Sequence, residues 1–162
     1  MSDALVVAAE DAGLLLRLGV ALILSAAIGW DRELRARSAG LRTHILVALA
    51  ATTFVVVARP LVAEVGPALG DQMTYDPTRI VHAVALGVGF LGAGAIFVHD
   101  ESKRVRGLTT AASIWATAAI GVAVGLGRWV LATGATVLVV FVLIGLRILE
   151  ARWMPDDTED SS

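Results

Sequence analysis

The sequence predicts an all-α protein, built as a polytopic membrane bundle of about five transmembrane helices. Of its 162 residues, 57% are hydrophobic and 17% are charged, whereas about 25% of the residues in a soluble domain are charged. Five apolar stretches approach the roughly 20 residues that a helix needs to cross a hydrocarbon core of about 30 Å. A soluble helical bundle would need polar helix faces, and the last three stretches show almost none. We therefore favour the membrane interpretation.

The apolar stretches cover about residues 13–30, 43–58, 80–98, 108–125 and 129–149. The first carries acidic rather than basic residues before it, so we expect a retained span and not a cleaved signal peptide. Residues 59–79 contain closely spaced prolines and glycines, which predict a connecting loop. We expect residues 1–150 to form one transmembrane domain and residues 151–162 a short, acidic, disordered tail.

The orientation follows from the arginines and lysines near the ends of the spans. They gather between the first and second stretches, between the third and fourth, and after the fifth. Because positive loops stay in the cytoplasm, we expect the N-terminus outside and the C-terminus in the cytoplasm. The chain contains no cysteine, which excludes disulfides and thiolate metal sites.

A dense group of polar residues lies where the first span ends and the second begins. Polar groups at such depth are costly and therefore mark candidate sites. A short loop between antiparallel helices should bring the two ends together, with Asp31 or Glu33 paired to Arg42. The alternative is that the arginines only anchor the inner face and the acids partly neutralise them. This predicted polar cluster comprises Asp31, Arg32, Glu33, Arg42, Thr43 and His44.

Glycines recur along the third and fourth stretches. Each would cost roughly 1 kcal/mol in a soluble helix, but in a bilayer a glycine lets a neighbouring helix approach closely. We therefore expect the third and fourth spans to pack tightly together. The predicted packing residues are Gly87, Gly89, Gly92 and Gly94, followed by the GxxxG pair Gly121 and Gly125. At the start of the fourth span, Thr109 and Thr110 should cap free amides, or alternatively contact an anion.

No catalytic or metal-binding pattern is visible. The sequence lacks a nucleophile elbow, a phosphate loop and a zinc motif, and by this topology His82 and Ser113 lie near opposite membrane faces and cannot meet. Acidic residues in 59–79 lack the spacing of a calcium loop. We therefore expect neither an enzyme, a metal site, a cofactor nor nucleic-acid binding. Membrane lipid, another membrane protein and a second copy of the chain are the expected partners.

Four ordered motifs now become specific in combination. They are Ile-Gly-Trp-Asp-Arg-Glu at 28–33, Ala-Gly-Leu-Arg-Thr-His at 39–44, Gly-Val-Gly-Phe-Leu-Gly-Ala-Gly at 87–94, and Arg-Gly-Leu-Thr-Thr-Ala-Ala-Ser-Ile-Trp at 106–115. Together they closely resemble the membrane domain of the MgtC/SapB family, over about residues 14–150. The resemblance implies a bacterial inner-membrane protein with several spans. Besides the polar and glycine positions above, it marks Gly40, Leu41, Phe90, Gly107, Thr109, Thr110 and Trp115 as motif residues.

The resemblance also implies a role in adaptation to low magnesium or acid stress and, for some members, in survival inside macrophages. Such members are thought to restrain the F-type ATP synthase rather than to import magnesium. Virulence-associated members often read Gly-Leu-Asn-Thr at 107–110 and carry a soluble C-terminal domain. This chain instead has Gly-Leu-Thr-Thr at 107–110 and ends about a dozen residues after its last expected span. Both differences favour a resemblance to the short SapB or YhiD-like members. We therefore expect a non-enzymatic regulator acting through intramembrane protein contacts; the alternative is a small magnesium or cation transporter or channel working as an oligomer.

Overall fold

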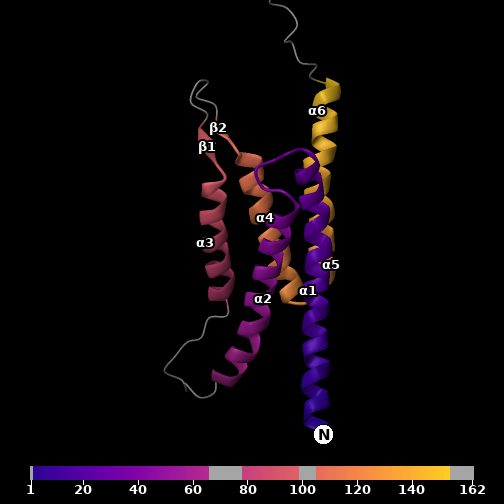
Figure 1. The fold of residues 1–162 in the computed structure, drawn as a ribbon, viewed down its shortest axis with the longest axis vertical. Coiled ribbons are helices and arrows are strands. Elements are labelled where there is room, and N and C mark those ends of the chain that lie inside the picture. Colours follow the sequence, from indigo (N-terminus) through magenta and orange to yellow (C-terminus); the bar gives the residue numbers. More distant parts are fainter. Residues whose placement is uncertain (1, 66–77, 99–104, 154–162) are drawn as a thin grey trace, which may run out of the picture.

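The fold is a bundle of helices that run along one long axis in alternating directions (Figure 1). The structure is a computed structural model and describes residues 2–65, 78–98 and 105–153. The all-α membrane bundle expected from the sequence is confirmed. Its helices are α1 (Ser2–Leu34), α2 (Leu41–Val65), α3 (Thr78–Gly94), α4 (Leu108–Gly125), α5 (Trp129–Val140) and α6 (Arg147–Trp153), with a π-helical segment η2 (Phe141–Leu146) joining the last two.

Among the described residues, four helical stretches are long and apolar enough to cross a membrane. These candidate spans are Asp11–Leu34, Leu41–Ala58, Leu108–Gly125 and Trp129–Leu149. The apolar helix α3 is shorter, with 17 residues, which gives it a length of about 26 Å against a hydrocarbon core of about 30 Å. Four of the five expected spans therefore have full length, and the third is a short helix.

The third predicted stretch was too long at its end. Helix α3 stops at Gly94, and Phe97–Val98 (β1) pairs antiparallel with Val105–Arg106 (β2). The chain then enters α4 through Gly107, whose φ of 91° is in the left-handed region. A Cβ atom there would lie 1.9 Å from the carbonyl oxygen of Ala95, so only glycine fits. The close approach of Gly107 to Ala95 accompanies the early end of α3, and a hydropathy pattern cannot reveal it.

Two other predicted boundaries also move. Helix α2 continues to Val65, so residues 59–65 are helical and not part of a loop. Pro60 lies inside this helix and, without a backbone N–H, leaves one helix hydrogen bond unmade. Helix α6 reaches Trp153, so the predicted tail overlaps it. The rest of that tail, the acidic residues of 66–77, and the basic residues of 99–104 lie outside the described residues.

Helix α4 is the central element of the bundle, and 67% of its span is buried. It contacts α1, α2, α3 and α5. Two glycines let α2 approach it: a Cβ at Gly121 would lie 2.6 Å from the carbonyl oxygen of Ala48, and one at Gly125 would lie 2.7 Å from the Cβ of Val55. The predicted GxxxG contact therefore exists, but the neighbour is α2 and not α3.

Helix α3 packs on the bundle along a narrow strip. Only Val88 and Gly92 are buried, and a Cβ at Gly92 would lie 3.6 Å from the Cβ of Ala111 on α4. The expected packing of the third and fourth spans is therefore confirmed at Gly92. At Gly87, Gly89 and Gly94 a Cβ would meet no neighbouring atom of this chain within 4 Å, so the packing of these three against another helix stays a prediction.

Candidate functional site

The alternating helix directions collect most of the described arginines at one end of the bundle. The α1–α2 connection, the β1–β2 pair and α6 all lie there (Figure 1). The charge asymmetry on which the predicted orientation rests is therefore present in the fold. The arginines of this basic end are Arg32, Arg35, Arg37, Arg42, Arg106, Arg147 and Arg152.

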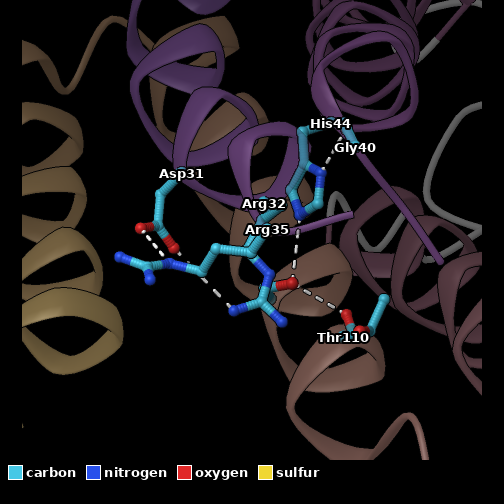
Figure 2. Close-up of polar contacts among 7 residues, drawn as sticks. Asp31, Arg32, Arg35, Gly40, His44 and Thr110 are labelled. Atoms are coloured by element: carbon cyan, nitrogen blue, oxygen red, sulfur yellow. Dashed lines mark hydrogen bonds and ion pairs between the residues drawn. The ribbon is translucent and has the colours of Figure 1, made fainter. Parts of the chain in front are cut away.

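Asp31 is buried at the end of α1 and pairs with two arginines close to it in the sequence. Its Oδ1 accepts a hydrogen bond of 2.6 Å from Nε of Arg35, the residue directly after α1, and its Oδ2 lies 3.9 Å from Nη1 of Arg32 (Figure 2). The predicted pairing with Arg42 is wrong, because Arg35, four residues along the chain, already meets this carboxylate. Arg42 and Thr43 are exposed. Two buried atoms, Asp31 Oδ2 and Arg32 Nε, have no hydrogen-bond partner.

Glu33 joins the two helices in a different way. Its Oε2 accepts a hydrogen bond of 2.9 Å from the backbone N–H of Leu41, the first residue of α2. The carboxylate thus satisfies a free amide at a helix N-terminus, where negative charge is favourable. A Cβ at Gly40 would lie 1.8 Å from the same Oε2, so a larger residue there would displace the Glu33 carboxylate. Glu33, Gly40 and Leu41 therefore together connect the end of α1 to the start of α2.

His44 is fully buried and connects α2 to α4. Its Nε2 lies 3.0 Å from Oγ of Ser113, and its Nδ1 lies 2.8 Å from the carbonyl oxygen of Gly40 (Figure 2). The Ser113 hydroxyl also lies 2.8 Å from the carbonyl oxygen of Thr110. Because Gly40 can only accept, Nδ1 carries a proton, and in a neutral ring Nε2 then accepts. Ser113 has one proton for two acceptors, so all three contacts are made at once only when the ring holds both protons.

The His44–Ser113 contact is the feature that sequence reasoning missed. Ser113 was considered only against His82, which is exposed on α3. His44 lies at the start of the second stretch and Ser113 near the start of the fourth. Because the spans alternate in direction, these two starts lie at the same membrane face. The similar depth of His44 and Ser113 at this face was the sequence feature that could have predicted their contact. The pair resembles a nucleophile and base, but Ser113 is only 3% exposed and a carbonyl, not a carboxylate, orients the imidazole.

Four other interior hydroxyls donate hydrogen bonds to helix carbonyls. Thr52 of α2 donates to the carbonyl of Gly121 on α4 at 2.8 Å, a second polar contact between these helices. Ser25, Thr117 and Thr136 each donate to a carbonyl four residues earlier in their own helices. In the part of the chain that the structure describes, no group of three or more His, Asp or Glu side chains could hold a metal ion.

Arg17 makes two contacts at the end of the bundle opposite the basic end. Its Nη1 donates a hydrogen bond to the carbonyl of Gly125, the last residue of α4. The guanidinium also lies 5.9 Å from the centroid of the Trp129 ring, within the range of a cation–π contact. A cation at a helix C-terminus interacts favourably with the free carbonyls. Arg17 therefore stabilises the α4–α5 turn.

The remaining motif residues fall at the start of α4 and on exposed faces. Gly107 is the N-cap of α4, and no side-chain cap hydrogen bond is made there. The expected capping by Thr109 and Thr110 is therefore absent from this N-cap: Thr109 is exposed and Thr110 is buried inside the helix. Phe90 on α3 is 82% exposed, and Trp115 on α4 is also exposed.

Comparison with known proteins identifies the family of the chain. A model of the MgtC family matches residues 18–152. The chain belongs to the MgtC family. "Putative magnesium transporter YhiD" from Escherichia coli K12 is 42% identical over 140 residues, which are 86% of this chain and 63% of YhiD. Protein MgtC from Brucella abortus strain 2308 is 46% identical over 132 residues, or 82% of this chain and 50% of MgtC.

A third relative matches along nearly its whole length. Protein SrpB from Synechococcus elongatus is 38% identical over 173 residues, covering 91% of each chain. The chain therefore spans about half to two-thirds of MgtC and YhiD but nearly all of SrpB. No solved structure matches. Family membership confirms the resemblance drawn from the four motifs and, with the apolar helices, shows a membrane protein.

Proposed function

We propose that this chain is a non-enzymatic regulator of the bacterial inner membrane. It acts by docking another membrane protein within the bilayer, during adaptation to low magnesium or to acid stress. The magnesium context comes from the name of the relative YhiD and from the MgtC family. By resemblance to the family, the F-type ATP synthase is the first partner to test.

The observation that carries this proposal is the uncovered face of α3. Gly87 and Gly94, seven residues apart and therefore on one side of the helix, leave backbone open there. Leu86 and Phe90 beside them are 80% and 82% exposed. In a bilayer, apolar exposure alone marks no partner, because lipid tails are apolar too. Open glycine backbone does favour one, since close helix approach gains van der Waals contacts that lipid tails cannot match.

A groove beside this face offers room for a partner helix. It lies between α2 and α3, has a volume of about 660 Å³ and is lined by apolar side chains throughout. Leu46 and Phe54 of α2 form one wall, and Leu91 of α3 belongs to the other. Large side chains of a partner helix would fill the groove while its backbone approaches the glycines.

The interior of the bundle favours docking over conduction. Magnesium gives up its water reluctantly and is bound through carboxylates. In the described parts of the spans, Asp31 and Glu33 lie at the basic end and Asp11 at the opposite end, so no described acid sits at mid-depth. The interior hydroxyls are directed to helix carbonyls.

Gly87→Leu, compared with Gly134→Leu, tests the docking face. Both glycines are exposed and a Cβ at either meets nothing within 4 Å, but Gly87 lines the groove and Gly134 lies on α5, away from it. In a bacterium lacking its own MgtC-family protein, the Gly87→Leu variant should reach a normal membrane level but fail to support growth at low magnesium. Gly134→Leu should preserve growth. Equal growth of the two variants would contradict the proposal.

The polar cluster at the α1–α2 connection belongs to the same proposal. Arg42 is exposed at the basic end, where it is available to a partner. Arg42→Ala should therefore reduce growth at low magnesium while the protein remains inserted, as measured by its membrane level. Full growth of this variant would remove Arg42 from the functional surface and leave the cluster with its structural role in joining α1 to α2.

A magnesium transporter is the second candidate, because the relative YhiD is named a putative magnesium transporter. It would require several copies to enclose a pathway, with the buried Asp31 as its candidate carboxylate. Direct measurement of magnesium flux separates the two functions.

A further inference from the structure

A second pocket lies at the basic end, where α1, the start of α4 and the η2–α6 region meet. Its volume is about 300 Å³. Its polar wall consists of four arginines and a threonine, and its apolar wall consists of a valine and two leucines. The lining residues, none of them acidic, are Arg32, Arg35, Arg37, Thr109, Val142, Leu143, Leu146 and Arg147. We call this the arginine pocket.

The charges of the arginine pocket are poorly compensated by the protein. Asp31 pairs with Arg35 at 2.6 Å but lies 3.9 Å from Arg32. Arg32 is 4% exposed, and its Nε has no hydrogen-bond partner. A buried guanidinium N–H without an acceptor is costly, and the converging arginines repel one another. An anion in the pocket would compensate these positive charges.

We propose that the arginine pocket binds the phosphate of an anionic membrane phospholipid. Guanidinium groups bind phosphate oxygens through paired hydrogen bonds, and basic pockets between transmembrane helices on the cytoplasmic side bind anionic lipid headgroups. A free phosphate ion would need only the polar wall. The apolar wall of Val142, Leu143 and Leu146 matches the glycerol and first acyl carbons of a lipid. This inference does not depend on the regulatory function proposed above.

The π-helical segment forms this apolar wall. Residues Phe141–Leu146 are wound more widely than an α-helix, and such segments frequently occur at functional sites. A Cβ at Gly145 would lie 3.0 Å from the Phe141 ring, so glycine gives that ring its space. The segment contributes the three apolar residues of the wall and leads directly into Arg147.

The test is a thermal unfolding titration of the full chain in detergent micelles, with phosphatidylglycerol, phosphatidylcholine or inorganic phosphate added. Phosphatidylglycerol should raise the unfolding midpoint in a saturable manner, and the other two should not. Arg37→Gln/Arg147→Gln should weaken the apparent affinity about thirtyfold, because each arginine contributes separately to anionic lipid binding. Arg37→Lys/Arg147→Lys keeps the charge and should lose less affinity.

The matched control is Arg106→Gln/Arg152→Gln, which removes two exposed arginines of the same basic end outside the pocket. This control should bind phosphatidylglycerol like the unmodified chain. An equal loss in the control would show general surface attraction and overturn the site. An equal midpoint shift with inorganic phosphate, or with phosphatidylcholine, would overturn the choice of an anionic lipid.

Discussion

Helices α2 and α3 both pack on α4, but they do so in opposite ways. The α2–α4 contact contains glycines pressed against backbone, a buried His44–Ser113 hydrogen bond and a Thr52–Gly121 hydrogen bond. The α3–α4 contact buries only Val88 and Gly92 of α3 and leaves three glycines open. The same residue type therefore serves a closed interface inside the chain on one helix and an unoccupied surface on the other.

The largest expected effect comes from removing the imidazole at the α2–α4 contact. His44→Ala should lower the free energy of unfolding by about 3 kcal/mol, through the cavity and the lost hydrogen bonds. His82→Ala on the exposed side of α3 should change it by less than about 0.5 kcal/mol. Denaturant unfolding of both variants in detergent measures the difference. Similar values would mean that α2 and α3 are attached equally firmly.

A smaller difference is expected between two glycines. Gly121→Ala places a Cβ 2.6 Å from the Ala48 carbonyl oxygen and should destabilise the fold by about 1–3 kcal/mol through overpacking. Gly87→Ala fills open space on α3 and should leave stability unchanged or slightly improved. The unfolding midpoints of the two variants decide this. A destabilised Gly87→Ala would show that the α3 face is already occupied in the isolated protein.

The smallest expected effect concerns the end of α4 opposite the basic end. Arg17→Gln removes a hydrogen bond to Gly125 and a cation–π contact with Trp129, which should cost about 1 kcal/mol. Arg79→Gln, an exposed arginine on α3, serves as the control and should be neutral. Thermal unfolding of both variants compares them. If Arg17→Gln left the stability unchanged, only the contacts near His44 would hold α4 firmly in the bundle.

Hydropathy and turn residues were enough to predict the bundle, because a helix that crosses a membrane must satisfy its backbone internally and present apolar side chains. They could not predict where α3 ends, since that depends on the left-handed backbone of Gly107 against Ala95. The GxxxG spacing identified a close helix contact at Gly121 and Gly125. It could not identify the neighbour, because spacing says nothing about which helix a face meets.

The polar cluster shows the same limit at the level of single contacts. Its members were recognised by residue type and depth, but Asp31 had both Arg35, directly after its own helix, and Arg42 across the loop as possible partners. The nearer, i to i+4 partner prevails. The His44–Ser113 contact joins residues 69 positions apart, and only the packing of α2 against α4 brings them together.

Magnesium flux is the most direct test of whether the chain docks partners or conducts ions. The purified full chain would be placed in sealed proteoliposomes with a magnesium-sensitive dye inside, and its folding and insertion verified. The account predicts no uptake above that of empty liposomes. Saturable uptake that Asp31→Ala abolishes would contradict it and make the protein a transporter.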